Sequence, residues 1–441
     1  MLNLRTNLRT LLVPAAAIVF AACGDEEPTG PVDTGPDNIA EIAQSTDDVS
    51  TLAAALEAAG LVTALEGDGP FTVFAPVNSA FAALGDDVVA GLLEDANADL
   101  LTRILTFHVV PGTAAFSGDL SDGQTVTTLE GNELTIGVSG SSVTVNGAAV
   151  TTADIEAENG VIHLIDGVLV PPIDIVERAI LTAETQTLVD AVVAGDLVAT
   201  LKGDGPFTVF APINAAFEAL GTDKLDVLLA PENQALLQKI LTYHVIAGDV
   251  RAADLVDGAT ATTVEGTEVT FDLSGETPMV NGAGIIATDI VTENGVIHLI
   301  DGVLTENADI VDVAVLNGFE TLVDLVIEAD LVTTLRSDNG GDGFTVFAPT
   351  DEAFAELSAV PTGQALVDVL TYHVVAATVG SGDLSDGQVV TTVEGSTFTV
   401  NIDGSTVTIT DGSGATVGVV LTDVPAANGV VHVIDGVLLP S

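Results

Sequence analysis

The chain has 441 residues, and its 64 acidic and nine basic residues give a formal net charge of −55 at pH 7. A field of that sign repels nucleic acids and anionic lipid headgroups, so neither is an expected partner. Because 47% of the residues are hydrophobic, the composition is that of a folded protein and not of a disordered polyacid. The acids are scattered among Gly and Thr, which favours a role in solubility, as in a saline habitat, over cation or basic-partner binding.

The first 23 residues have the pattern of an export signal. Arg5 and Arg9 form a positive segment, and the apolar stretch that follows is shorter than the roughly 20 residues that span a bilayer. The sequence Phe-Ala-Ala-Cys that ends at Cys23 resembles a bacterial lipobox, whose cysteine is lipidated, although Leu is usual where Phe20 stands. Cys23 is the only cysteine of the chain, which excludes a disulfide framework and favours lipidation over ordinary signal cleavage.

Residues 24–36 are rich in Pro, Gly and acids, and we predict a disordered tether there. No later apolar run is long enough to cross a membrane. The expected location is therefore the cell envelope, periplasmic or at the cell surface, with an N-terminal lipid as the only membrane contact.

The segment after the tether begins with apolar residues at helical spacing. Helices are predicted over 39–43 and 49–59, where Val49, Leu52 and Leu56 share one face. Residues 71–75 alternate in polarity and are typical of a half-buried strand.

The second half of this segment is richer in strand signals. Asn78 is predicted as the N-cap of a helix, and a further helix over 97–108 precedes short Thr/Val-rich strands. The Asn-Gly at 159–160 predicts a type I′ turn before a last strand over 161–165. Helices followed by strands indicate an α+β domain.

Three motifs then recur along the chain with a period near 135 residues. They are Gly-Asp-Gly-Pro-Phe-Thr-Val-Phe-Ala-Pro at 67–76, with counterparts at 203–212 and 341–349; an aromatic-His pair at 107–108, 243–244 and 372–373; and Asn-Gly-Val-Ile-His-Leu-Ile-Asp-Gly-Val-Leu at 159–169, with counterparts at 294–304 and 428–438. A period of this length is the size of a whole domain and not of a solenoid repeat. The chain is therefore predicted to contain three copies of one domain. The third copy is eight residues shorter between the first two motifs, so a short helix should be reduced there.

The first and last motifs resemble the two boxes of the fasciclin domain family, and the aromatic-His pair resembles its central Tyr-His. Copy one departs from that pattern because Phe107 stands where the family has Tyr. The resemblance implies three tandem α+β domains, each a β-rich wedge or sandwich with helices packed in its N-terminal half. The predicted boundaries are 1–23 for the signal peptide, 24–36 for the tether, and 37–172, 173–305 and 306–441 for the three domains.

All six histidines fall in these motifs, two in each copy. His108, His244 and His373 close apolar helical stripes, which favours hydrogen-bonded core residues over ligands. His163, His298 and His432 lie in strands three residues before Asp166, Asp301 and Asp435. Residues at i and i+3 of a strand point to opposite faces, so these pairs are structural motifs and not chelates. No metal site, cofactor site or catalytic constellation is predicted.

The resemblance implies extracellular adhesion and matrix association, with protein partners or matrix and envelope polymers. Carried over by position, it marks Tyr243, His244, Tyr372 and His373 as interaction residues, with Phe107 and His108 in doubt because the phenol is missing. We therefore expect a non-enzymatic adhesion or interaction protein built as a rod of three domains. The alternative is a carbohydrate- or small-ligand-binding envelope lipoprotein.

Overall fold

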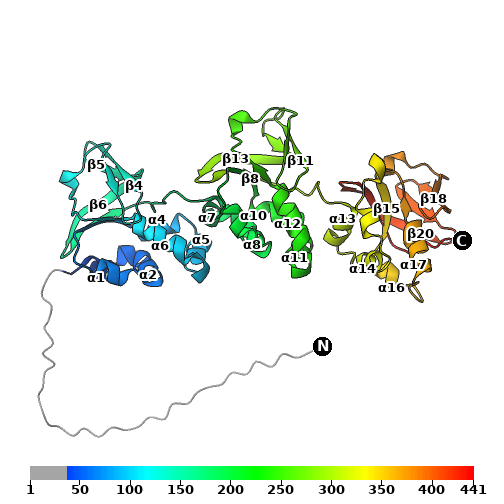
Figure 1. Cartoon of the computed structure of the whole chain (residues 1–441), viewed down its shortest axis with the longest axis horizontal. Coiled ribbons are helices and arrows are strands. Elements are labelled where there is room, and N and C mark those ends of the chain that lie inside the picture. Colours follow the sequence, from blue (N-terminus) through cyan, green and yellow to red (C-terminus); the bar gives the residue numbers. More distant parts are fainter. Residues whose placement is uncertain (1–36) are drawn as a thin grey trace, which may run out of the picture.

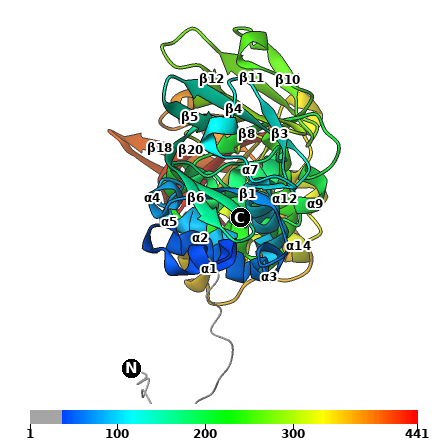
Figure 2. The ribbon, with the colours of Figure 1, turned by 90° about the vertical axis from the view of Figure 1, so that its left-hand side faces the viewer.

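The computed structural model describes residues 37–441. The predicted signal peptide, Cys23 and the tether lie outside these residues. Three domains follow one another along the longest axis, and in each the helices lie on the lower side of Figure 1 and the outer strands on the upper side. The end-on view of Figure 2 shows the same separation, with α1, α2 and α3 below the strands β3, β4 and β5.

The three domains share one order of elements. In the first, the helices and strands are α1 (Ile39–Ser45), α2 (Ser50–Ala58), α3 (Val62–Leu65), β1 (Phe71–Pro76), α4 (Asn78–Ala82), α5 (Asp86–Leu92), α6 (Ala98–Phe107), β2 (Val109–Pro111), β3 (Thr125–Thr127), β4 (Glu133–Ser139), β5 (Ser142–Val145), β6 (Ala148–Ala157) and β7 (Gly160–Ile165). In the second, they are α7 (Ile175–Ile180), α8 (Gln186–Ala194), α9 (Val198–Leu201), β8 (Phe207–Pro212), α10 (Asn214–Leu220), α11 (Thr222–Leu229), α12 (Gln234–Tyr243), β9 (Val245–Ala247), β10 (Thr260–Thr262), β11 (Glu268–Asp272), β12 (Met279–Val280), β13 (Ala283–Thr292) and β14 (Gly295–Ile300).

The third domain repeats this order with one helix fewer. Its elements are α13 (Ile310–Leu316), α14 (Glu320–Glu328), α15 (Val332–Leu335), β15 (Phe344–Pro349), α16 (Asp351–Ala355), α17 (Gln364–Tyr372), β16 (Val374–Val375), β17 (Val389–Thr391), β18 (Thr397–Asp403), β19 (Thr406–Thr410), β20 (Thr416–Ala426) and β21 (Gly429–Ile434). No counterpart of α5 or α11 stands between α16 and α17, as the shorter sequence of the third copy predicts.

Each domain contains a seven-stranded sheet, ordered β2-β1-β7-β6-β5-β4-β3 in the first. The first and last boxes supply β1 and β7, the second and third strands of this order, which we call the central strands of the domain. They pair in parallel from Phe71 opposite Gly160 to Pro76 opposite Ile165. A glycine is required at the start of β7, because a Cβ on Gly160 would lie 2.1 Å from the carbonyl oxygen of Phe71. Helices and strands in these proportions confirm the predicted α+β class.

The strand β1 divides the first domain into two cores because its side chains alternate between two faces. Val73 and Ala75 pack in the cluster formed by the helices. Phe74 packs on the other face, in a cluster with Leu134 of β4 and Val145 of β5. The outer strands therefore fold over the far face of the central strands and form the predicted β-rich wedge.

Two local predictions were wrong in informative ways. Asn78 does not cap its own helix; its side-chain oxygen accepts the N–H of Thr51 at 2.9 Å and its amide donates to Asp47 O at 2.7 Å, so it caps α2 instead. The hairpin between β6 and β7 is present, but Glu158 and Asn159 form its turn and neither has positive φ. The turn is therefore not type I′. The Asn159 side chain accepts the N–H of Ile39 and donates to the carbonyls of residues 65 and 67.

Candidate functional site

The aromatic-His pairs lie inside the domains. Each of the six side chains is at most 3% exposed; they are Phe107, His108, Tyr243, His244, Tyr372 and His373. A partner that contacts the folded protein reaches none of them directly. Any influence of this motif on binding has to act through the residues that cover it.

Both ring nitrogens of His108 are used within the fold. Nδ1 donates to the carbonyl of Ile104 at 2.7 Å, and Nε2 accepts the backbone N–H of Leu169 at 2.9 Å. Both bonds exist only in the neutral imidazole with its proton on Nδ1. Burial lowers the pKa of His108 to about 4, against the raising effect of the Ile104 carbonyl. Equivalent bonds join His244 to Ile240 and Leu304, and His373 to Val369 and Leu438.

The two tyrosines of the motif use their hydroxyls to hold the wedge. Tyr243 donates to the carbonyl of Glu268 at 3.0 Å and accepts from the Asn281 amide at 2.6 Å. Tyr372 donates to the carbonyl of Thr397 at 2.8 Å and accepts Gly412 N–H at 2.9 Å. Burial raises the pKa of both phenols. Phe107 occupies the same place without these bonds.

The histidine of the last box joins the two central strands to a neighbouring loop. His163 stacks on Phe74 with ring centroids 5.5 Å apart. Its Nε2 donates to Ala115 O at 2.8 Å, and its Nδ1 accepts Asp154 N–H at 3.2 Å. His298 and His432 have the corresponding partners in their domains.

The side chain of Asp166, three residues later, has a different partner from that of His163. Asp166 Oδ1 accepts the N–H of Ala149 at 2.6 Å and so holds β6 to the end of β7. Asp301 and Asp435 accept Gly284 N–H and Gly418 N–H in the same way. Among residues 37–441, no group of three or more His, Cys, Asp or Glu side chains is arranged to hold a metal ion.

A set of charged residues lies at the two domain junctions and was not predicted from the sequence. At the first junction, Arg103 of α6 donates to Glu177 Oε2 of α7 at 2.8 Å and to the carbonyl of Pro172 at 2.6 Å. Lys202, which follows α9, lies 3.4 Å from Glu177 Oε1. The Glu177 carboxylate thus lies between Arg103 of the first domain and Lys202 of its own domain.

The second junction repeats this arrangement one domain further along. Lys239 of α12 donates to Asp312 Oδ2 of α13 at 2.7 Å, and Arg336, which follows α15, lies 2.9 Å from Asp312 Oδ1. The side chain of Asp312 is only 2% exposed. Burial by itself lowers the pKa of Lys239, but the hydrogen bond and charge of Asp312 raise it overall.

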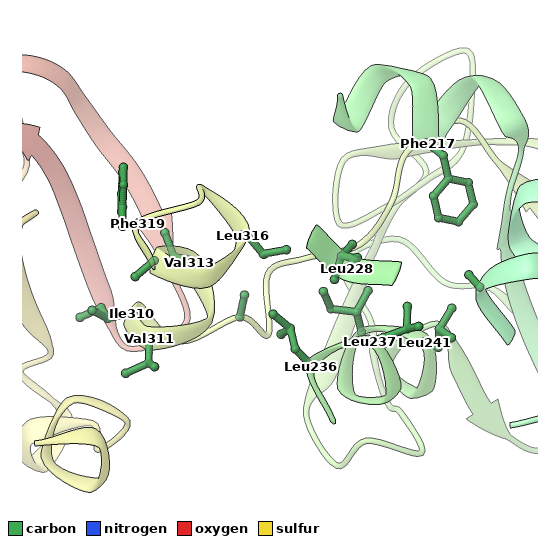
Figure 3. Packing of buried hydrophobic residues seen from close by; sticks show 14 of the residues in the cluster. Phe217, Leu228, Leu236, Leu237, Leu241, Ile310, Val311, Val313, Leu316 and Phe319 are labelled. Atoms are coloured by element: carbon green, nitrogen blue, oxygen red, sulfur yellow. The ribbon is translucent and has the colours of Figure 1, made fainter. Parts of the chain in front are cut away.

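Apolar side chains accompany these ion pairs at both junctions. One cluster of buried residues continues from α5 and α6 through the second domain to α13 and α14 of the third. Figure 3 shows Leu228 and Leu236 of the second domain opposite Leu316 of the third. One signal in the sequence could have indicated the junctions: only seven basic residues follow Arg9, and Arg103, Lys202, Lys239 and Arg336 are four of them.

These features define a chain of tandem domains, each a seven-stranded wedge fastened by buried aromatic and histidine motifs. A model of the fasciclin domain matches residues 47–171, 183–306 and 317–440, and the chain therefore belongs to the fasciclin domain family. Within residues 37–441 no helix combines the length and the apolar character needed to cross a bilayer.

The chain is similar to animal and cyanobacterial proteins. It is 33% identical over 345 residues to the transforming growth factor-beta-induced protein ig-h3 of Sus scrofa (76% of this chain, 49% of that protein) and 31% identical over 354 residues to periostin of Homo sapiens (78% and 41%). It thus spans about half the length of these relatives or less. It is 50% identical over 134 residues to protein sll1483 of Synechocystis (30% and 73%).

One solved structure is similar to part of the chain. It is a FAS1 domain pair from the insect cell adhesion molecule fasciclin I, with 18% sequence identity and a TM-score of 0.31, and it covers 61% of this chain and 96% of that one.

Proposed function

We propose that this chain is a non-enzymatic adhesion or interaction protein, built as a rod of three fasciclin domains and held at the cell envelope by a lipid on Cys23. The domains of the rod are residues 37–172, 173–305 and 306–441. The observation that carries the proposal is the repeated junction, because a fixed spacing between domains matters for a protein that presents several surfaces at once. A catalytic domain gains nothing from it.

The residue types at the junction positions differ between the copies that form a junction there in this sequence and the copy that does not. Arg103 and Lys239 lie five residues before the central histidine, and the same position in the last domain is Asp368. Lys202 and Arg336 follow the third helix of their domains, and the same position in the first domain is Glu66. Cations thus occur at these positions only where a junction is formed, which supports selection for a fixed arrangement of the three domains.

The missing helix of the third domain fits the same interpretation. In the first two domains α5 and α11 pack against α7 and α13, the first helices of the following domains. The third domain, which has no following domain in this sequence, lacks that helix. The three copies therefore differ in the residues and the helix that form the junctions, and they share the motifs that stabilise each domain.

A carbohydrate-binding role is less well supported. Sugar platforms use exposed aromatic rings, and the Phe and Tyr side chains of residues 37–441 are all buried or half-buried. Where the acidic surface contacts a basic protein partner, salt weakens the attraction.

Binding of full-length and shortened chains to envelope and matrix preparations tests the proposal. Three weak sites on one rod give avidity through effective concentration, so retention should fall steeply as domains are deleted. Added salt should reduce it further. Equal retention of one-, two- and three-domain chains would contradict the rod, and saturable binding of a single glycan would favour the carbohydrate alternative.

A further inference from the structure

The second domain contains a large apolar cavity that the other two domains do not share. It has a volume of about 580 Å³ and lies among α7, α8, α9 and the central strands, with Val192, Leu201, Phe207 and Ile297 in its wall. The corresponding sites of the third and first domains have volumes of only about 30 Å³ and about 20 Å³. The cavity of the second domain is therefore not a general property of the fold.

Three differences from the first domain reduce the apolar side-chain volume at this site. At the seventh position of the second helix, Leu56 of the first domain is replaced by the smaller Val192. Ile42 lines the small cavity of the first domain. Its counterpart in the second domain is Arg178, which does not line the large cavity. Val49 lines the small cavity too, whereas its counterpart Thr185 turns away and donates to the carbonyl of Ala179 at 2.8 Å.

The third domain fills the same positions differently. Val313 corresponds to Arg178, Phe319 to Thr185 and Leu325 to Ala191, and all three belong to the buried core. Protein interiors are packed about as densely as organic crystals, with few voids larger than a water molecule. An empty apolar space of this size costs stability. Its volume falls within the roughly 300–1,000 Å³ of small-molecule sites.

The polar groups at the cavity indicate what kind of molecule it suits. His244 and Thr242 line it, but their side chains are bonded within the fold, to Ile240 and Leu304 and to Gln238. The charged groups are Glu94, Asp190 and Lys202, and Lys202 is already paired with Glu177. Two carboxylates and one neutralised cation disfavour an anion, and a wall that is mainly aliphatic disfavours a sugar.

We propose that the second domain binds an uncharged apolar molecule with an alkyl chain in this cavity. Glu94 and Asn97 also line the cavity, so residues of the first domain contribute to its edge, next to the first junction. Ligand binding and the joining of these two domains are therefore expected to support each other.

Titration of the full chain with the uncharged dye Nile red tests the proposal. We expect one saturable site with a blue-shifted emission, which 1-dodecanol displaces and which dodecanoate at pH 8 displaces at least about tenfold less well. Val192→Leu restores the residue of the first domain and should weaken dye binding about threefold or more, because one buried methylene's worth of space is lost. Val192→Phe should abolish binding.

The matched controls are Val326→Leu and Val326→Phe, the same changes at the same position of the third domain, and they should leave dye binding unchanged. Circular dichroism shows whether each variant folds. If Val192→Phe does not fold, the dye affinity of Val192→Leu tests the proposal. The absence of a saturable site in the native chain, or equal affinity of folded Val192→Leu and Val326→Leu chains, would overturn the proposal. Equal displacement by dodecanoate would overturn the assignment to an uncharged ligand.

Discussion

The imidazole of His244, at the end of α12, accepts a hydrogen bond of 2.9 Å from the backbone N–H of Leu304, the last residue of the final box. The carbonyl of His244 in turn accepts the N–H of Phe210, 2.9 Å away in the first box. One residue thus connects all three motifs of its domain. Its neutral state is part of the fold, and this explains why the motif is repeated with the domain.

The first prediction concerns pH. Burial lowers the pKa of His108, His244 and His373 to about 4, whereas an unfolded histidine has a pKa near 6.5. Between these values the unfolded chain binds protons that the folded chain excludes, so stability falls as the pH falls from about 6.5 to about 4. Each domain should lose roughly 3 kcal/mol over this window. Denaturant unfolding at a series of pH values measures this, and a flat profile between pH 6.5 and 4 would rule the mechanism out.

Removing one of these rings should be costly at any pH. His244→Ala leaves the carbonyl of Ile240 and the N–H of Leu304 without partners inside the protein, and should destabilise the second domain by roughly 1–3 kcal/mol. The same variant tests the structural role of the six histidines. Stoichiometric zinc binding by the native chain that His244→Ala removes would show a ligand role instead.

The hydroxyl of Tyr243 offers a smaller and cleaner test. Tyr243→Phe removes the bonds to Glu268 and Asn281 and should cost about 0.5–1.5 kcal/mol of unfolding free energy. The first domain has evolved with Phe107 at this place, so Phe107→Leu, which changes the packing alone, is a useful comparison. If Tyr243→Phe leaves the unfolding free energy unchanged, water replaces the hydrogen bonds of the phenol at no cost in stability.

Much of the fold could be predicted from the sequence because its signals are local and repeated. The three copies, the central strands of the two boxes and the shorter third copy all follow from motif spacing. The partner of Asn78 could not be predicted, because an Asn before a helix has the same local pattern whether it caps that helix or α2, 27 residues earlier.

The junctions show a second limit of the sequence. Glu177 and Arg103 are 74 residues apart, and nothing local to either indicates the other. Comparison between the copies contains the missing information. The position of Arg103 is a cation in the first two copies and Asp368 in the third, and the position of Lys202 is a cation in the last two copies and Glu66 in the first. The cavity of the second domain could have been suspected in the same way, from Arg178 and Thr185 at positions that are apolar in the other copies.

The anchoring prediction falls on Cys23, outside the described residues. Cys23→Ala should move the protein from the membrane fraction to the soluble fraction, because a lipid is the only membrane contact that we propose. Mass spectrometry of the mature N-terminus is the direct measurement. An unmodified Cys23, or a mature chain that begins elsewhere, would contradict lipidation.

The last prediction concerns the stiffness of the second junction. Lys239→Glu places a carboxylate against Asp309 and the buried Asp312, which then keep only Arg336 as a counter-ion. Breaking a buried ion pair costs up to roughly 3–5 kcal/mol, less here because Lys239 is partly exposed. That energy opposes docking of the third domain, so the distance between the second and third domains should become broadly distributed. Fluorescence energy transfer between dyes on these domains measures it.

Arg251→Glu is the matched control for this experiment, because it makes the same change of net charge in the same domain and disrupts only a pairing with Asp249. Its distance distribution should stay as narrow as that of the native chain. Raising the salt concentration should loosen the native junction only slightly, since salt screens buried pairs much less than exposed ones. If Lys239→Glu and Arg251→Glu give the same narrow distribution, the charged residues do not fix the junction, and the packing of α11 against α13 must be sufficient to hold it.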